Sequence, residues 1–243
     1  MKMKRFLIPI IAIGVFVACC GGNDKKDVAE GQSNKVLTAE EQAQLTPDKV
    51  IAILKQGNAE FVNNELTVRN NTELVKDAAQ GQYPKAVILS CLDSRVPVED
   101  VFHRAIGDIF VARVAGNIVN ADILGSMEFA CAASGAKLVM VLGHGACGAV
   151  KNAIADTRLG NITEMLSKIQ PAVAESKIGF DGETTASNAC FVEKVGHQNV
   201  ILAVKEIRAN SPILKEMEDK GEIKIIGGYY DMETGKVEFM ENI

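Results

Sequence analysis

Four short apolar runs limit the folds open to this chain more than any other part of its sequence. They cover Ala86–Ser90, Ile109–Val114, Leu138–Leu142 and Ile223–Ile226, and each is bounded by turn residues. Apolar runs of this length without polar alternation predict strands that are buried on both faces. Helical patterns separate the runs, so the sequence predicts a three-layer α/β fold with a mainly parallel β-sheet flanked by helices.

Helices are expected before, between and after these strands. Thr38 opens a capping box, and Thr46 precedes Pro47, so two helices are expected in an N-terminal helical arm. The segment Tyr229–Phe239 is expected to form a terminal hairpin with Gly235 in its turn. Further helical patterns cover residues 122–134, 149–156, 162–177, 187–208 and 211–220.

The N-terminus has the pattern of a signal peptide. Lys2, Lys4 and Arg5 precede a 13-residue apolar run, which is shorter than the roughly 20 residues that span a bilayer. A small residue stands before Cys19, as in the cleavage box of bacterial lipoproteins, so Cys19 is expected to be lipidated. We therefore expect an exported protein, lipid-anchored at the periplasmic or outer-membrane face of a bacterial envelope. An uncleaved anchor and a disulfide between Cys19 and Cys20 remain alternatives.

The chain is expected to have three parts. Residues 1–18 form the lipoprotein signal peptide, 19–37 a flexible tether without apolar periodicity, and 38–243 a single folded domain. With 243 residues, 47% of them apolar, the chain is long enough to bury a core without disulfides. A net charge of -5 and the absence of Trp argue against nucleic-acid binding, because phosphates attract cations and bases stack on aromatic rings.

Two reactive clusters follow directly after two of the predicted strands. Cys91, Asp93 and Arg95 follow the first apolar run, and His144 and Cys147 follow the third. The carboxyl ends of parallel strands meet at the ligand-binding edge of an open sheet, so these side chains are expected to converge. Two thiolates and one imidazole fill three of the four positions of tetrahedral zinc and leave one open, as in catalytic sites. The alternative is two buried core cysteines and a hydrogen-bonded histidine.

The spacing of Asp93 and Arg95 favours a catalytic reading of this site. Residues two apart in an extended stretch face the same side, so Arg95 is expected to bind the Asp93 carboxylate in a bidentate pair beside Cys91. A carboxylate held there can accept a hydrogen bond from a metal-bound hydroxide and orient it. Without Arg95, Asp93 would be free to occupy the open position as a conditional fourth metal ligand.

The stretch Gly143–Gly148 also matches the dinucleotide-binding pattern G-x-G-x-x-G. No second strand follows promptly, and no acidic residue stands at a strand end where a ribose would need one. The glycines are therefore better explained by close backbone approach at a metal-binding loop. A P-loop is excluded because Ala149 stands where that motif requires Lys.

Together these residues resemble the β-class carbonic anhydrases, from about Pro47 to Phe239. The resemblance implies one Zn²⁺ per chain held by Cys91, His144 and Cys147, beside an Asp93–Arg95 pair. It implies reversible hydration of CO2 to bicarbonate and a proton, with zinc-bound hydroxide as the nucleophile. It also implies a homodimer or a dimer of dimers, with pockets near the subunit interface. The matching stretches are Cys91–Pro97, Gly107–Arg113 with Ala115–Asn117, Gly143–Gly148, and Gly227–Asp231 with Thr234–Gly235.

The same resemblance implies the substrate contacts. Gln82, nine residues before Cys91, would offer its side-chain amide, and Phe110 and Phe129 would form an apolar wall. The backbone of Gly148 is a further expected contact to a substrate oxygen. Phe129 stands where many family members carry Tyr. Some members bind a regulatory bicarbonate with a Trp, which this chain lacks.

The other histidines and cysteines are assigned structural roles. His103 and His197 are expected to be surface or packing residues, and Cys131 and Cys190 core residues on helices, with a disulfide between the two left open. Two other functions remain as alternatives: a non-catalytic zinc-binding lipoprotein, and an enzyme for a CO2-like substrate such as carbonyl sulfide. Because two thiolates neutralise the charge of Zn²⁺, activity is expected to rise towards alkaline pH.

Overall fold

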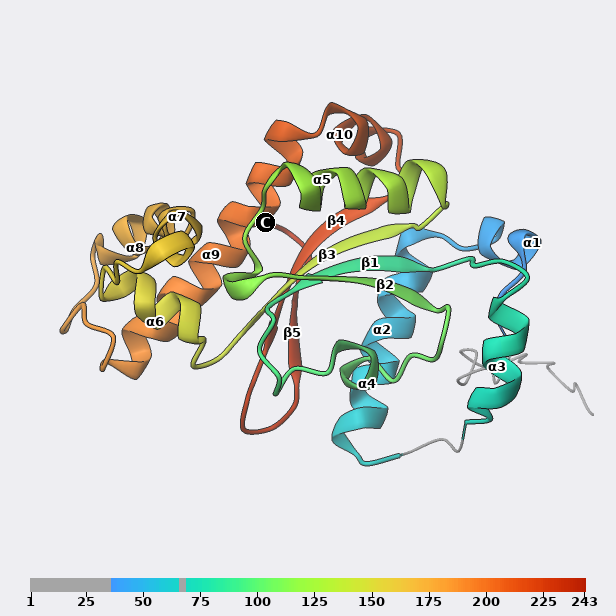
Figure 1. Ribbon diagram of the computed structural model, residues 1–243, viewed down its shortest axis with the longest axis horizontal. Helices are drawn as coiled ribbons and strands as arrows, with labels where there is room; N and C mark the ends of the chain where they lie inside the picture. Colours follow the sequence, from blue (N-terminus) through green and yellow to red (C-terminus); the bar gives the residue numbers. More distant parts are fainter. Residues whose placement is uncertain (1–35, 66–68) are drawn as a thin grey trace, which may run out of the picture.

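The computed structural model describes residues 36–65 and 69–243. A five-stranded sheet in the order β2-β1-β3-β4-β5 lies between helical layers (Figure 1). β1 to β4 are parallel and β5 is antiparallel, which confirms the expected three-layer fold with a mainly parallel sheet. The strands are β1 (Ala86–Ser90), β2 (Ile109–Arg113), β3 (Leu138–His144), β4 (Lys224–Tyr230) and β5 (Val237–Met240).

The helices surround the sheet in groups. α5, α9 and α10 lie on one face, α2 and α4 on the other, and α6, α7 and α8 pack beyond the carboxyl end of β3 (Figure 1). The bounds are α1 (Ala39–Ala43), α2 (Pro47–Val62), α3 (Asn71–Ala78), α4 (Val98–Val101), α5 (Ala121–Glu128), α6 (Gly148–Ile154), α7 (Gly160–Ser167), α8 (Gln170–Lys177), α9 (Ala189–Asn210) and α10 (Pro212–Asp219). A 3₁₀ turn, η1 (Ala115–Asn117), and a π-helical turn, η2 (Phe129–Ala133), complete the set.

The central strands divide the interior into two cores. All five residues of β1 and all seven of β3 are buried, because each strand has a neighbour on both sides and helices on both faces. Val87 and Leu89 of β1 contact the core beneath α5 and α9, whereas Ala86 and Ile88 contact the core beside α2. This alternation follows from the period of two in an extended strand.

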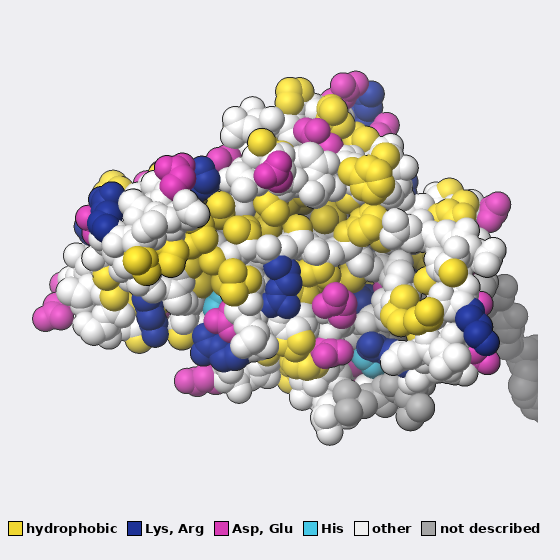
Figure 2. Space-filling view, viewed as in Figure 1, with side chains coloured by type: hydrophobic (Ala, Val, Ile, Leu, Met, Phe, Trp, Pro, Cys, Tyr) yellow, Lys and Arg dark blue, Asp and Glu magenta, His cyan; other side chains and the backbone are white. Residues whose placement is uncertain are grey.

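The second predicted strand is less buried than expected. β2 is an edge strand that pairs with β1, and its residues are half-buried or exposed rather than buried on both faces. Figure 2 shows hydrophobic side chains in a band across this side of the molecule, over β2 and beneath α5. A groove of about 630 Å³ between β2 and α5 is lined by Phe110, Ala112 and Phe129, among others. The apolar side chains of β2 therefore lie on a face that the described residues leave uncovered.

Two segments that were each predicted to form one helix form two shorter elements in the structure. The pattern over residues 162–177 forms α7 and α8, because Pro171, in the first turn of α8, has no N–H to continue a preceding helix. The pattern over 122–134 forms α5 and then the π-helical turn η2, which begins at Phe129. The helices α3 and α4 were not predicted.

The C-terminal hairpin forms, but its first arm is longer than expected. The run Ile223–Ile226 and the first arm of the hairpin are one strand, β4, which is parallel to β3 and antiparallel to β5. Gly235 lies in the turn with φ of 74°, as predicted. The Asn58 amide of α2 donates to the Gly235 carbonyl at 2.9 Å, and its oxygen accepts from the Val237 N–H at 2.8 Å.

The predicted N-terminal caps are confirmed, whereas the predicted targeting segment lies outside the described residues. Thr38 and Thr46 accept hydrogen bonds from the first turns of α1 and α2. The predicted signal peptide, Cys19 and the tether as far as residue 35 lie outside the described residues. Within residues 36–65 and 69–243, no helix is long and apolar enough to span a bilayer.

Candidate metal centre

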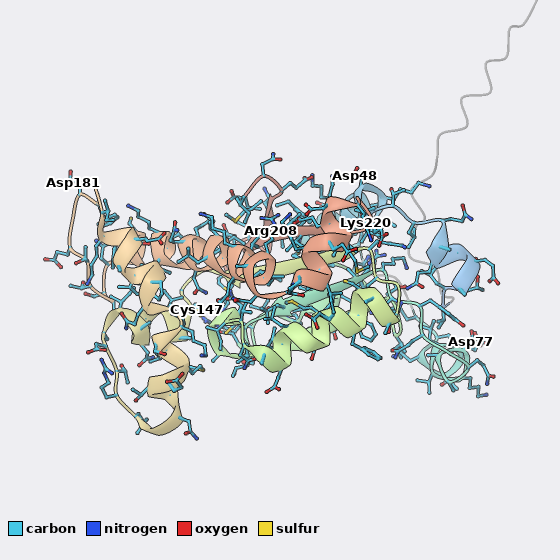
Figure 3. The ribbon with its side chains drawn as sticks, turned by 90° about the horizontal axis from the view of Figure 1, so that it is seen from above. Asp48, Asp77, Cys147, Asp181, Arg208 and Lys220 are labelled. Atoms are coloured by element: carbon cyan, nitrogen blue, oxygen red, sulfur yellow. The ribbon has the colours of Figure 1, made fainter. Side chains whose placement is uncertain are left out.

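The strand order brings the two reactive clusters together. β2 lies on one side of β1 and β3 on the other, so the carboxyl ends of β1 and β3 meet at a topological switch point, where open sheets bind ligands. Cys91 follows β1, His144 ends β3, and Cys147 is the N-cap of α6. Their ligand atoms lie within 4.8 Å of one another, and all three residues are buried. Figure 3 shows Cys147 where the sheet meets the α6–α8 group. The predicted convergence is confirmed.

Local backbone geometry shapes the turn between His144 and Cys147. The Gly145 N–H donates to the Tyr230 carbonyl at 3.0 Å, so the β3–β4 pairing continues one residue past His144. Ala146 has a φ of 51°, in the left-handed region, which bends the chain sharply towards α6. A tight turn therefore places the imidazole and the second thiol on the same side.

The protonation of His144 fits a metal ligand. Its Nδ1 lies 2.9 Å from the Gly145 carbonyl oxygen, which only accepts, so Nδ1 carries the proton. Nε2 therefore has a free lone pair. It is buried and has no hydrogen-bond partner within the part of the chain that the structure describes. Since buried polar atoms are nearly always paired, a lone pair facing two sulfur atoms points to a cation between them. The alternative of a hydrogen-bonded core histidine leaves this atom unexplained.

The hydrogen bond between the two thiols moves their pKa values in opposite directions. The hydrogen bond from Cys147, assisted by the Gly116 N–H at 3.3 Å, lowers the pKa of the Cys91 thiol to about 4 although burial opposes this. The same hydrogen bond and burial raise the pKa of Cys147, although the N–H groups of Val150 and Ala149 in α6 oppose the rise. A divalent cation would displace the remaining proton, because metal ions bind thiolates. Two sulfurs and one nitrogen are the donor set that zinc prefers.

Arg95 holds Asp93 beside this cluster. The Arg95 Nε donates to Asp93 Oδ1 at 2.9 Å and Nη2 donates to Oδ2 at 2.7 Å, which is the predicted bidentate pair. The pair forms in a turn rather than in an extended stretch, because the Arg95 N–H also donates to Oδ1 at 3.0 Å. Arg95 holds the pKa of the Asp93 carboxyl well below its usual range. Asp93 Oδ2 lies 3.9 Å from His144 Nε2, so an ionised carboxylate borders the metal position.

Arg113 supports this loop, although the sequence analysis gave it no role. Its Nε donates to the Cys91 carbonyl at 2.9 Å and its Nη2 to the Asp93 carbonyl at 2.6 Å. Arg113 is the last residue of β2 and pairs in register with Ser90, directly before Cys91. In the sequence, Arg113 stands out only as a single charged residue at the end of an apolar run. Its contacts become visible only with the strand register.

The predicted substrate residues divide into two groups. Gly148 is the first residue of α6 and directly follows Cys147, so it lies at the cluster. Gln82, Phe110 and Phe129 do not reach the cluster within one chain. Gln82 precedes β1, at the opposite end from Cys91, and is exposed. Phe110 pairs with Val87 in register, about 13 Å from Cys91 along the strand at 3.3 Å per residue.

Phe110 and Phe129 lie together away from the metal ligands. Their ring centroids are 6.4 Å apart, and both line the groove beside β2. Phe129 is 56% exposed, which is unusual for a large apolar side chain. An apolar wall built from these rings is thus present, but one chain does not bring it to its own metal ligands.

The remaining histidines have packing roles, as expected. His103 is buried, with Nδ1 2.7 Å from Glu60, and His197 stacks on Tyr229 at a centroid distance of 3.7 Å. Cys131 is buried in the core, and burial raises its pKa to about 12. Cys190 is exposed in the first turn of α9, so the expectation that it belongs to the core was wrong. The helical pattern around Cys190 predicted a helix but did not show which face of that helix packs against the sheet.

Close backbone approach explains only the first glycine of the G-x-G-x-x-G pattern. A Cβ on Gly143 would lie 2.5 Å from a Val200 methyl, so this glycine lets α9 pack closely on β3. A Cβ on Gly145 would lie 3.5 Å from Met232, in ordinary contact, and one on Gly148 would meet open space. The expectation that close approach accounts for all three glycines was therefore wrong for Gly145 and Gly148.

Comparisons with known proteins agree with this site. A family model described as carbonic anhydrase matches residues 86–237. Carbonic anhydrase 2 of Mycobacterium tuberculosis is 32% identical over 196 residues, which cover 78% of this chain and 91% of the relative. The carbonic anhydrase of Pseudomonas aeruginosa is 30% identical over 176 residues, covering 70% and 79%.

Solved structures share the fold. The β-carbonic anhydrase of Coccomyxa, solved with acetazolamide, superposes with a TM-score of 0.63 at 26% identity and covers 69% of this chain and 77% of that one. A tetrameric β-carbonic anhydrase of Sordaria macrospora superposes with a TM-score of 0.62 at 25% identity, covering 70% and 86%. By its family match, its relatives and its Cys-His-Cys cluster, this chain belongs to the β-class carbonic anhydrases.

Proposed function

We propose that this protein catalyses the reversible hydration of CO2 to bicarbonate and a proton, with one Zn²⁺ per chain held by Cys91, His144 and Cys147. The observation that carries the proposal is the buried Nε2 of His144, which has no hydrogen-bond partner among the described residues and lies close to two thiols and to an ionised Asp93. When bound, zinc supplies a Lewis acid that lowers the pKa of a water molecule.

The residues around the ligands orient the reactants. Asp93 is ionised, so it only accepts hydrogen bonds, and it therefore orients an O–H group rather than a bare oxygen. Arg95 holds both carboxylate oxygens, which prevents Asp93 from turning onto the metal position. The Gly148 backbone, next to Cys147, offers a contact to a substrate oxygen.

A second copy of the chain completes the pocket in this proposal. Gln82, Phe110 and Phe129 lie away from the metal ligands of their own chain, and the groove beside β2 is apolar. A homodimer that buries this groove would bring these residues to the partner's metal ligands. The tetrameric relative from Sordaria macrospora supports assembly, either as a dimer or as a dimer of dimers.

Subunit complementation tests the shared pocket. We expect Gln82→Ala and Asp93→Ala each to be nearly inactive, whereas co-assembled hybrids recover up to about half of the wild-type activity. In such a hybrid, one site pairs an intact Asp93 with the partner's intact Gln82. If both residues act within one chain, mixing restores nothing, and the shared pocket is rejected.

Stopped-flow CO2 hydration, with a metal assay on the same samples, tests the reaction. We expect fast turnover with about one zinc per chain, and a loss of about a hundredfold or more in Asp93→Ala at unchanged zinc content. The matched control is Asp156→Ala, which removes the acid of another Asp–Arg pair, at the surface beside Arg158. Stoichiometric zinc without turnover between pH 6 and 9 would favour a non-catalytic zinc protein. Turnover of carbonyl sulfide but not CO2 would instead indicate the CO2-like substrate.

We also propose that Cys19 is lipidated and anchors the protein at the bacterial envelope. The support is the sequence alone: a cationic segment, a short apolar run and a small residue before Cys19. Acylation at Cys19 would anchor the chain stably if two or more acyl chains are attached. Labelling with a fatty-acid analogue should mark the wild-type chain and not Cys19→Ala. A wild-type chain recovered without label would reject the anchor.

A further inference from the structure

A chain of two hydrogen bonds connects α9 to the metal ligand Cys91. The Asn199 side-chain Nδ2 donates to the Gly116 carbonyl at 2.9 Å, and the Gly116 N–H donates to the Cys91 sulfur at 3.3 Å. Asn199 is 5% exposed and Gly116 is buried. No other polar contact of the Asn199 side chain is seen within the described part of the chain, so its amide donor is directed to this one carbonyl.

The Gly116 backbone is conformationally permissive, so its orientation depends on its contacts. Its φ is 71°, in the left-handed region that glycine adopts without a steric penalty. A Cβ at this position would lie 2.6 Å from the Ile169 side chain and 3.1 Å from Ala149. Glycine is therefore required here, but glycine alone fixes neither φ nor ψ. The Asn117 N–H closes this turn by donating to the Val114 carbonyl at 3.0 Å, and Asn199 adds the side-chain contact that holds the Gly116 peptide group itself.

Asn199 is otherwise a costly residue at its position. It lies in the interior of α9, on the buried face that also carries Val195 and Val200. Asn is a weak helix former, and an unpaired buried amide destabilises the fold. An aliphatic residue would suit this face better. The contact with Gly116 accounts for the amide, because α9 is a long helix packed on β3 and β4 and makes a rigid support.

We infer that Asn199 is a positioning residue for metal binding, which acts through Gly116 to keep an N–H donor on the Cys91 sulfur. An N–H···S hydrogen bond stabilises a thiolate and reduces the electron density that it donates to a metal. Asn199 thereby sets both the orientation of Cys91 and its strength as a ligand. The inference rests on the metal site of the proposed function, but not on turnover.

The test compares two buried asparagines in the full-length protein. Asn199→Leu removes the amide with little change in volume. Asn58→Leu is the matched control, because Asn58 is 6% exposed and its amide also donates to backbone carbonyls, of Val101 and Gly235, in α2 away from the metal ligands. Each variant is loaded with Co²⁺ in place of zinc, and its thiolate-to-cobalt absorption band, metal affinity and melting temperature are measured.

We expect Asn199→Leu to shift the charge-transfer band to lower energy and to weaken metal binding by about ten- to a hundredfold. Asn58→Leu should lower the melting temperature but leave the band and the affinity unchanged. If Asn199→Leu loses stability with an unchanged band and affinity, Asn199 is a structural residue and the inference fails. A wild-type protein that binds cobalt but does not hydrate CO2 would refute the proposed function and leave this inference standing.

Discussion

At the scale of single residues, the ion pair between Arg95 and Asp93 joins an exposed side chain to one that is mostly buried. Arg95 is exposed, yet two of its nitrogens hold both oxygens of Asp93, a carboxylate that is mostly shielded from solvent. The pair costs little to form because its residues are only two apart in one turn. The pair matters because it fixes the position of the Asp93 carboxylate. This negative charge lies 3.9 Å from His144 Nε2, and Arg95 keeps it off the metal position.

Arg95→Ala should lower CO2 hydration by about tenfold or more, because the freed Asp93 carboxylate can turn onto the metal and occupy its open position. Cobalt absorption measures this directly, since a fourth protein ligand changes the ligand-field bands. Arg158→Ala is the control, because it breaks a solvent-exposed Arg–Asp pair away from the site. Loss of activity with an unchanged cobalt spectrum would contradict the role given to Arg95.

CO2 hydration activity should rise with pH between pH 6 and 9, because two thiolates make the bound metal a weaker acid. Asp93 should not contribute to this rise. Arg95 lowers its pKa, so the carboxylate is already ionised above the acidic range and loses its charge only when the pH falls well below 4. Asp93→Asn should therefore reduce the rate without removing the alkaline rise. A flat wild-type profile, or loss of the rise in Asp93→Asn, would contradict this prediction.

Among the elements, α9 determines how closely the helical layer approaches the ligand-bearing strands. It packs on β3 and β4 where glycines replace side chains: a Cβ on Gly143 or on Gly227 would lie within 2.7 Å of Val200. Gly196 on α9 itself leaves space for the Tyr229 ring. The strand that ends in His144 is thus held by the same helix that holds Gly116.

Gly143→Ala should destabilise the fold by about 1–3 kcal/mol, because the added methyl meets the stiff Val200 side chain at 2.5 Å. For a protein of this size, the melting temperature should fall by about 2–4 °C for each kcal/mol. Gly228→Ala, on the neighbouring strand, is the graded control, since its methyl would meet only the flexible ends of Met140 and Leu142 at 3.1 and 3.3 Å. Equal melting temperatures for the two variants would show that α9 adjusts freely.

At the scale of the whole molecule, the proposed dimer depends on the face around β2, which the described residues leave uncovered. Figure 2 shows its hydrophobic band. Phe129, in the π-helical turn that follows α5, lines the groove on this face. A monomer would expose this face to water, whereas a pair of chains would bury it and complete two pockets at once. Assembly and catalysis are therefore expected to be lost together.

Phe129→Glu should dissociate the assembly and abolish most CO2 hydration while each chain keeps its zinc, because a buried carboxylate without a partner opposes association. Light scattering and a metal assay measure both effects. Ile178→Glu is the control: it places the same charge on a residue that is 77% exposed in the loop after α8. A Phe129→Glu protein that stays assembled would argue for a different interface.

The layers, the candidate metal ligands and the resemblance to the family could be predicted from the sequence alone. They depend on local patterns: apolar runs of strand length, caps such as Thr46, and Cys91, His144 and Cys147 placed at strand ends. The sequence did not determine where β2 lies in the sheet, so it could not distinguish a buried strand from an edge strand. Nor could it place Phe110 beside Val87, away from the end of β1 that carries Cys91, because this depends on the strand register. Contacts such as Arg113 with Cys91, or Asn199 with Gly116, join residues far apart in the chain, and only tertiary packing brings them together.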